Sequence, residues 1–229
     1  SPACDAQATE RILEGTIGMG RIFGTDGIRG VAGVDMTPEL ALDLGRAAAT
    51  VVKERGNTHP HFLIGRDTRI SGGMLESAIA AGLCSVGADV TLLGVITTPG
   101  VAYLARKYQA DGAFVISASH NPYYDNGIKL INNFGEKMDE SVISLVEAYL
   151  DGNLEAFGRK WEELPLAKRD QIGRTVDHVA GRNRYIGYLI SLGMYSFKGV
   201  KVGLDCANGS SWNIAKCVFD ALGAKTYVI

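Results

Sequence analysis

Residues 116–130 read Ile-Ser-Ala-Ser-His-Asn-Pro-Tyr-Tyr-Asp-Asn-Gly-Ile-Lys-Leu, and this is the most informative part of the chain. An apolar run that ends at Ile116 leads directly into a polar turn, and a second apolar run begins at Ile128 and includes Lys129. The pattern predicts a strand that ends in the hydroxyl of Ser119, with a cation returning on the following strand. Such an arrangement can present a nucleophile to a phosphate group. A hairpin loop rich in turn-forming residues would explain the Asn, Pro, Asp and Gly of this stretch, but not the whole string.

Strand-like and helix-like segments alternate on both sides of this stretch. Thr37-Pro38 and Thr98-Pro99 are typical of helix starts, because threonine caps a helix and proline fits its first position. Apolar spacing predicts helices at about 38–55, 75–86, 98–108, 142–149 and 179–193, and strands at 61–65, 90–95, 113–118 and 128–131. This alternation predicts a three-layer α/β domain with a mixed sheet, followed by part of a second, similar α/β domain.

The chain divides into three predicted parts. Residues 1–18 lack an apolar core segment and are expected to be an upstream or cloning-derived extension with little fixed structure. Residues 19–172 form the first domain, with the serine loop, and its last part from about 151 is the link to the next domain. Residues 173–229 are expected to start a second, truncated domain. Within it, Val202 to Asp205 echoes Ile64 to Asp67, which indicates either an internal repeat or two generic strand-helix-strand units.

Two further segments could meet a ligand near the serine loop. Gly24 to Gly30 sets several glycines close together, which lets backbone N–H groups approach an anion, and Arg29 would add a forked, permanently charged contact. Gly65 to Arg69 sets two arginines around Asp67, which could orient one of them. A glycine-rich turn or a solvated surface loop would explain either segment taken alone.

Other chemistry is less consistent with the sequence. No Gly-x-Ser-x-Gly elbow occurs, so a hydrolase triad is unsupported. A phosphoryl-transfer role for Ser119 agrees better with the sequence, because nearby cations and a metal ion would offset the charge of the phosphate. Residues 205–211 precede a predicted helix start that could favour an anion or simply pack between domains, and we assign them no catalytic role.

Composition excludes several classes of protein. The chain has 229 residues, 46% of them hydrophobic and 21% charged, with a net charge of -2. This balance predicts a globular protein with no nucleic-acid partner, and no apolar run approaches the roughly 18–20 residues that span a bilayer, so no membrane partner is expected. The four cysteines lack Cys-x-x-Cys spacing, which favours reduced thiols and a cytoplasmic location.

Three segments together resemble the α-D-phosphohexomutase superfamily, and most of all its bacterial phosphoglucosamine mutases: Phe23 to Gly30, Gly65 to Arg69, and Ile116 to Lys129. The resemblance runs from about Met19 to Ile229. It implies an enzyme that interconverts glucosamine 6-phosphate and glucosamine 1-phosphate through a phosphoserine and a 1,6-bisphosphate, in a step toward peptidoglycan precursors. Alternatives are a phosphoglucomutase or phosphomannomutase, or a non-catalytic sugar-phosphate-binding protein.

The resemblance also implies roles for individual residues. Ser119 would be the phosphorylated residue and, through its phosphate, a ligand of Mg²⁺. The implied catalytic residues are Ser119, His120, Lys129 and Arg29, and the implied phosphate-binding residues are Asn121, Arg66 and Gly27. The implied partners are a hexosamine phosphate, a hexose 1,6-bisphosphate and a second copy of the chain in a homodimer. One departure is large, because the family's Asp-Gly-Asp-Gly-Asp-Arg metal loop is absent, so residues 1–229 alone are expected to be inactive.

Overall fold

A computed structural model describes residues 22–153 and 166–229. The predicted extension at 1–18 and most of the predicted link between the domains lie outside the described residues. Among the described residues, no helix is long and apolar enough to cross a membrane.

A six-stranded mixed sheet forms the centre of the larger unit, in the order β1-β5-β4-β2-β3-β6. The pairs β2–β4, β2–β3 and β3–β6 are parallel, whereas β5 is antiparallel to both of its neighbours. The strands are β1 (Ile28–Val31), β2 (His61–Arg66), β3 (Asp89–Val95), β4 (Gly112–Ile116), β5 (Asp125–Ile131) and β6 (Thr175–Asp177).

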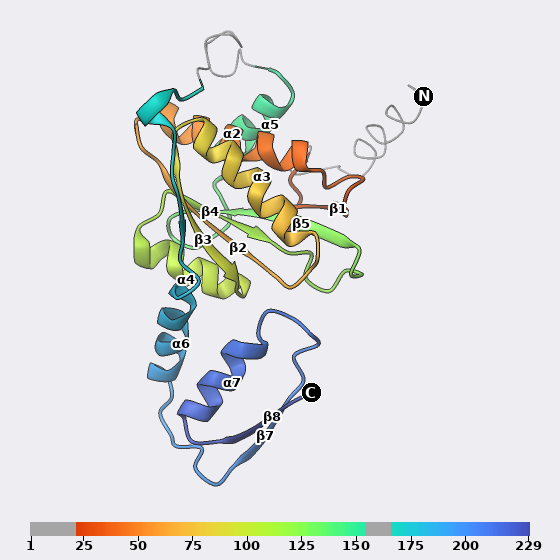
Figure 1. Cartoon of the computed structure of the whole chain (residues 1–229), viewed down its shortest axis with the longest axis vertical. Helices are drawn as coiled ribbons and strands as arrows, with labels where there is room; N and C mark the ends of the chain where they lie inside the picture. The colour runs from red at the N-terminus through yellow and green to blue at the C-terminus, as the bar shows by residue number, and fades with distance from the viewer. Residues whose placement is uncertain (1–21, 154–165) are drawn as a thin grey trace.

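Helices cover both faces of this sheet, as Figure 1 shows. One apolar core joins the sheet to α2, α3 and α5, and a second joins it to α4 and α6. The helices are α2 (Pro38–Glu54), α3 (Gly72–Ser85), α4 (Thr98–Tyr108), α5 (Glu140–Leu150) and α6 (Gly181–Ser191). The larger unit is therefore a three-layer α/β domain, as the alternating sequence pattern predicted.

The helix starts follow from the sequence. The Thr37 and Thr97 side chains accept hydrogen bonds from the N–H groups of Leu40 and Gly100, and a proline follows in the first turn of each helix. Both starts were predicted, although the α4 cap is Thr97 rather than Thr98. The Thr97 cap fixes where α4 begins, and the start of α4 lies beside the predicted site.

Two glycines allow α2 and α3 to pack at very short range. A Cβ added at Gly82 would lie 2.1 Å from the Leu42 carbonyl oxygen, and one added at Gly45 would lie 2.4 Å from that of Ile79. The helix backbones are thus nearly in contact at this crossing, and only glycine fits there.

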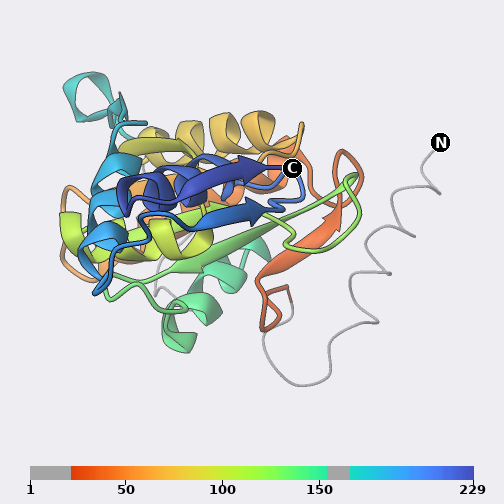
Figure 2. The ribbon, with the colours of Figure 1, turned by 90° about the horizontal axis from the view of Figure 1, so that it is seen from below.

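A smaller unit follows α6. It consists of β7 (Lys201–Leu204), α7 (Trp212–Ala221) and β8 (Lys225–Val228), and the two strands pair in parallel. Figure 2 shows these two strands, in blue, side by side and pointing in the same direction. The unit repeats the β2-α3-β3 arrangement, including a glycine with positive φ after the helix at both Gly87 and Gly223.

Two strands of the larger sheet were not predicted from the sequence. β1 falls in the segment interpreted as a glycine-rich turn. β6 lies beyond residue 172, yet it pairs with β3 of the larger sheet. In α6, Tyr188 is 37% exposed and stacks on Tyr103 of α4.

Candidate active site

The serine loop connects β4 to β5 at the carboxyl edge of the sheet. Its start is fixed by a hydrogen bond from the Ser117 N–H to the Gly127 carbonyl, 2.9 Å long. Ser119 is exposed and has a φ of 55°, in the left-handed region that non-glycine residues seldom adopt. Its N–H donates to the Ser117 hydroxyl oxygen at 3.1 Å, and its own Oγ lies 3.4 Å from Nδ1 of exposed His120. The hydroxyl is therefore open to an incoming group.

Arg69 holds this loop from the neighbouring β2–α3 connection. The carboxyl ends of β2 and β4 are adjacent, because these strands are parallel partners. The Arg69 guanidinium donates to Asp67 Oδ2 (3.0 Å) and to four main-chain oxygens of the serine loop, those of Ser119 (3.0 Å), Asn121 (2.9 Å), Pro122 and Asp125 (3.0 Å). With the Arg69 side chain only 10% exposed, this contact fastens the two loops together.

Arg29 and Asn121, both candidates from the sequence, meet at the loop. Arg29 lies on β1 opposite Gly127 of β5, and its Nη1 donates to Asn121 Oδ1 at 3.3 Å. Its Nη2 lies 3.7 Å from Asp26 Oδ2, while Asn121 Nδ2 donates to Asp125 Oδ2 at 3.0 Å. Within the described residues, the buried Nε of Arg29 has no hydrogen-bond partner.

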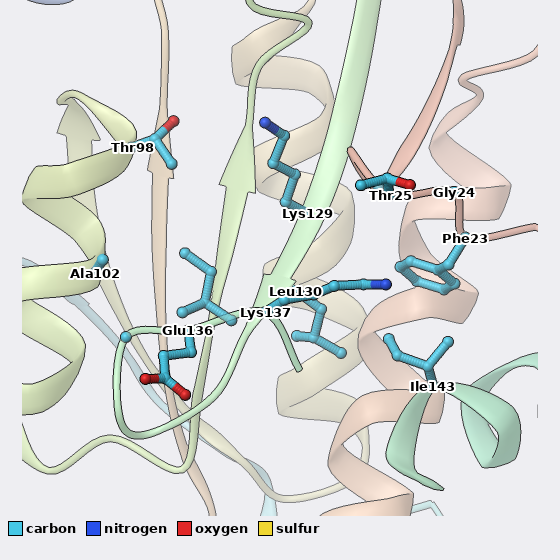
Figure 3. A pocket seen from close by; sticks show the side chains of 13 residues that line it. Phe23, Gly24, Thr25, Thr98, Ala102, Lys129, Leu130, Glu136, Lys137 and Ile143 are labelled. Carbon is cyan, nitrogen blue, oxygen red and sulfur yellow. The ribbon is translucent and has the colours of Figure 1, made fainter. Parts of the chain in front are cut away.

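Lys129 and Gly27 line a separate small hollow of about 200 Å³. Figure 3 shows the Lys129 side chain between Thr98 of α4 and Thr25 of the glycine-rich turn. In the described part of the chain Lys129 makes no hydrogen bond or ion pair, so its ammonium group is available to a ligand. Gly27 has φ +83°, and a Cβ there would lie 2.3 Å from the Ile128 carbonyl oxygen, so the turn requires glycine.

A larger cleft of about 1030 Å³ contains Ser119. It is lined by the β2–α3 loop, the serine loop, residues 207–211 of the smaller unit, and Thr97. The Thr68 hydroxyl donates to the Asn208 carbonyl at 2.8 Å, which joins the two units across the cleft. Thr97 lines the cleft and Thr98 lines the Lys129 hollow, so the two spaces adjoin at the start of α4.

Arg66 is placed differently from the other candidates. Its Nε pairs with Glu76 Oε2 of α3 at 3.0 Å, and Arg66 is not among the residues that line the cleft. The arginine that contacts the serine loop is instead Arg69. The structure thus brings Ser119, His120, Asn121 and Arg29 together, puts Lys129 and Gly27 in the adjoining hollow, and places Arg66 against α3.

The model of the phosphoglucomutase/phosphomannomutase α/β/α domain I matches residues 20–156, more than half of the chain. The chain belongs to this family. Curated relatives include phosphoglucosamine mutases of Lachnospira eligens, 55% identical over 212 residues, and of Caldicellulosiruptor bescii, 50% identical over 212 residues. These alignments cover 92% of the chain but only 46% and 45% of the two relatives, so the chain spans less than half of their length.

Solved structures show the family's fold. A phosphoglucomutase/phosphomannomutase family protein from Burkholderia thailandensis superimposes with a TM-score of 0.74 at 24% identity, covering 91% of this chain and 43% of that one. Parafusin, a phosphoglucomutase from Paramecium, gives 0.61 at 18% identity, covering 92% and 44%. The predicted α/β fold and the phosphohexomutase resemblance are therefore confirmed.

Sequence reasoning did not single out Arg69, the arginine that contacts the serine loop. The Gly65 to Arg69 segment indicated that Asp67 would orient one of two arginines, and it left open which. The Asp67 carboxylate binds both the Nε and the backbone N–H of Arg69, each at 3.0 Å. A signal was present, since Arg69 is two residues beyond Asp67 and Asp side chains commonly bond to the backbone at that spacing.

Proposed function

We propose that the protein containing this chain is a phosphoglucosamine mutase. The observation that supports this most directly is an exposed Ser119 in a cleft with basic side chains nearby, in a chain 55% identical to a protein of that name. Phosphorylated Ser119 would transfer its phosphoryl group to O1 of glucosamine 6-phosphate and form the 1,6-bisphosphate. The bisphosphate then returns its 6-phosphoryl group to Ser119 and leaves glucosamine 1-phosphate.

Positive charge around the cleft supports such a transfer. Arg29 reaches the serine loop through Asn121, and the ammonium group of Lys129 is unpaired among the described residues. The start of α4 lies between the cleft and the Lys129 hollow, and a helix start carries partial positive charge. Cations that offset the charge of a moving phosphoryl group supply much of the catalysis in this class of reaction. His120 Nδ1 lies 3.4 Å from Ser119 Oγ, and in this proposal His120 would exchange a proton with that hydroxyl after a closer approach.

A bound Mg²⁺ remains a prediction. The described residues hold no group of three or more His, Cys, Asp or Glu side chains that could bind a metal. Two acids of the loops around the serine are engaged, Asp67 with Arg69 and Asp125 with Asn121. These residues alone do not fit a tight Mg²⁺ site, which requires several oxygen ligands. The expected inactivity of residues 1–229 on their own, the homodimer and the cytoplasmic location also remain predictions.

The proposal is tested with the full-length protein, primed with a hexose 1,6-bisphosphate in the presence of Mg²⁺. We would compare kcat/KM for glucosamine 6-phosphate, glucose 6-phosphate and mannose 6-phosphate. We expect a clear preference for the amino sugar and loss of turnover in Ser119→Ala. A preference for a neutral sugar would keep the mechanism but overturn the substrate, and no turnover on any of the three would support a sugar-phosphate-binding protein instead.

A further inference from the structure

We propose that Arg69 is a positioning residue, which holds Ser119 in its reactive geometry by binding the main chain of the serine loop. This inference rests on the proposed function, because it concerns phosphoryl transfer at Ser119. Arg69 would act through the loop and would not itself bind the substrate's phosphate.

The hydrogen bonds of Arg69 account for its whole donor capacity. A guanidinium group has five N–H donors. In Arg69, Nε donates to Asp67, Nη1 to the carbonyls of Pro122 and Asp125, and Nη2 to those of Ser119 and Asn121. Every donor is therefore occupied by the protein itself, and none is left for a phosphate. Arg29 differs in this respect, since its Nε has no partner among the described residues.

Ser119 has a backbone conformation that these contacts help to hold. A left-handed φ is unfavourable for serine, and it persists only where the surroundings hold it. Arg69 binds the carbonyl of Ser119 itself and three further carbonyls within the next six residues. These bonds fix the main chain on the C-terminal side of Ser119, and the bond from the Ser119 N–H to the Ser117 hydroxyl oxygen holds the other side. Together they fix the direction in which Oγ points.

Lysine cannot replace this arrangement. Its ammonium group has three donors at one point, whereas the acceptors here surround a planar fork. Arg69→Lys therefore keeps the charge near Asp67 but loses most of the contacts with the loop. A group displaced by about 1 Å from its productive position can lower a rate roughly 100-fold.

The first experiment measures steady-state kinetics of full-length Arg69→Lys against wild type. We expect kcat to fall roughly 100-fold with little change in KM for the sugar phosphate, because the misplaced serine impairs the transfer and not substrate binding. Arg55→Lys is the matched control, since Arg55 is an exposed arginine whose Nη2 donates to Ser141 Oγ, away from the cleft. It should keep wild-type kcat and KM.

The second experiment measures amide hydrogen exchange of residues 117–125 in the same three proteins. We expect faster exchange of this loop in Arg69→Lys, with the β2 and β4 amides unchanged, and no difference in Arg55→Lys. A purely structural role would accelerate exchange across the whole sheet. If Arg69→Lys does not fold, Asp67→Asn serves instead, because it removes the charge that orients Arg69 and should give the same pattern in weaker form.

Two results would overturn the inference. Wild-type kcat and loop exchange in Arg69→Lys would show that the loop holds its shape without Arg69. A raised KM with unchanged kcat and unchanged loop exchange would show that Arg69 binds substrate directly. An inactive wild-type protein would instead refute the proposed function, so the two failures are distinguishable.

Discussion

Ser119 combines an exposed hydroxyl with a left-handed backbone, and these two properties have opposite effects on the protein. The hydroxyl gives the residue its proposed chemistry. The backbone conformation costs folding free energy, because the Cβ of a non-glycine residue crowds the main chain there. Strain of this kind is common where a side chain must be held in a fixed direction.

This strain predicts an order of stability for two variants at residue 119. Ser119→Gly should be more stable than Ser119→Ala by about 1 kcal/mol, because glycine adopts a positive φ without a Cβ clash. Urea unfolding of both variants measures the difference. Equal stabilities, or a more stable alanine variant, would show that residue 119 is not strained in solution.

At the scale of elements, the α2–α3 crossing depends on Gly45 and Gly82. Both helices contribute to the core on the same face of the sheet, and α3 connects the Arg69 loop to β3. The close approach of their backbones leaves no room for a methyl group at Gly82, 2.1 Å from the Leu42 carbonyl oxygen. A residue of higher helix propensity at position 82 therefore cannot stabilise α3.

We therefore expect Gly82→Ala to destabilise the protein by about 1–3 kcal/mol, the usual cost of overpacking a core. Gly73, also in α3, is the matched control, since nothing lies within 4 Å of a Cβ built there. Gly73→Ala should be neutral or stabilising by up to about 1 kcal/mol, from its higher helix propensity. Denaturant unfolding compares the two, and a neutral Gly82→Ala would contradict the close crossing.

Much of this architecture could be predicted from the sequence, and the exceptions have physical reasons. Helix caps such as Thr37 and apolar strands such as β4 leave local signals that need no partner to be recognised. β6 has only three residues, all exposed, so its pairing with β3 leaves no apolar pattern. The acceptors of Arg69 are main-chain carbonyls some fifty residues away, and main-chain groups have no sequence signature.

At the scale of the whole molecule, His61 links stability to pH. It begins β2, and its Nε2 lies 2.8 Å from the Thr91 hydroxyl of β3. Burial lowers the pKa of His61, and this outweighs the opposing effect of Asp111 and Asp89. Unfolding exposes the ring and returns its pKa to the ordinary value of about 6.5. The unfolded chain therefore binds a proton more readily than the folded protein.

The sign of the pH effect follows from this difference. The contribution of His61 to stability is complete above about pH 6.5 and is lost as the pH falls toward the lower folded pKa. In urea unfolding between pH 7.5 and 5, His61→Gln should lose less stability on acidification than wild type. His59→Gln is the control, because His59 is exposed two residues upstream, and it should keep the wild-type slope. A wild-type slope in His61→Gln would refute the assignment.

Because Arg69 binds carbonyl oxygens, its hold on the serine loop does not depend on the side chains of the residues whose carbonyls it binds. Tyr123 and Tyr124 are 82% and 52% exposed, and the bonds from Arg69 do not involve either of them. Substitutions there can alter what the loop presents to a ligand while Ser119 stays where it is. Side chains exposed on this loop can therefore change while the bonds from Arg69 to the main chain of the loop are kept.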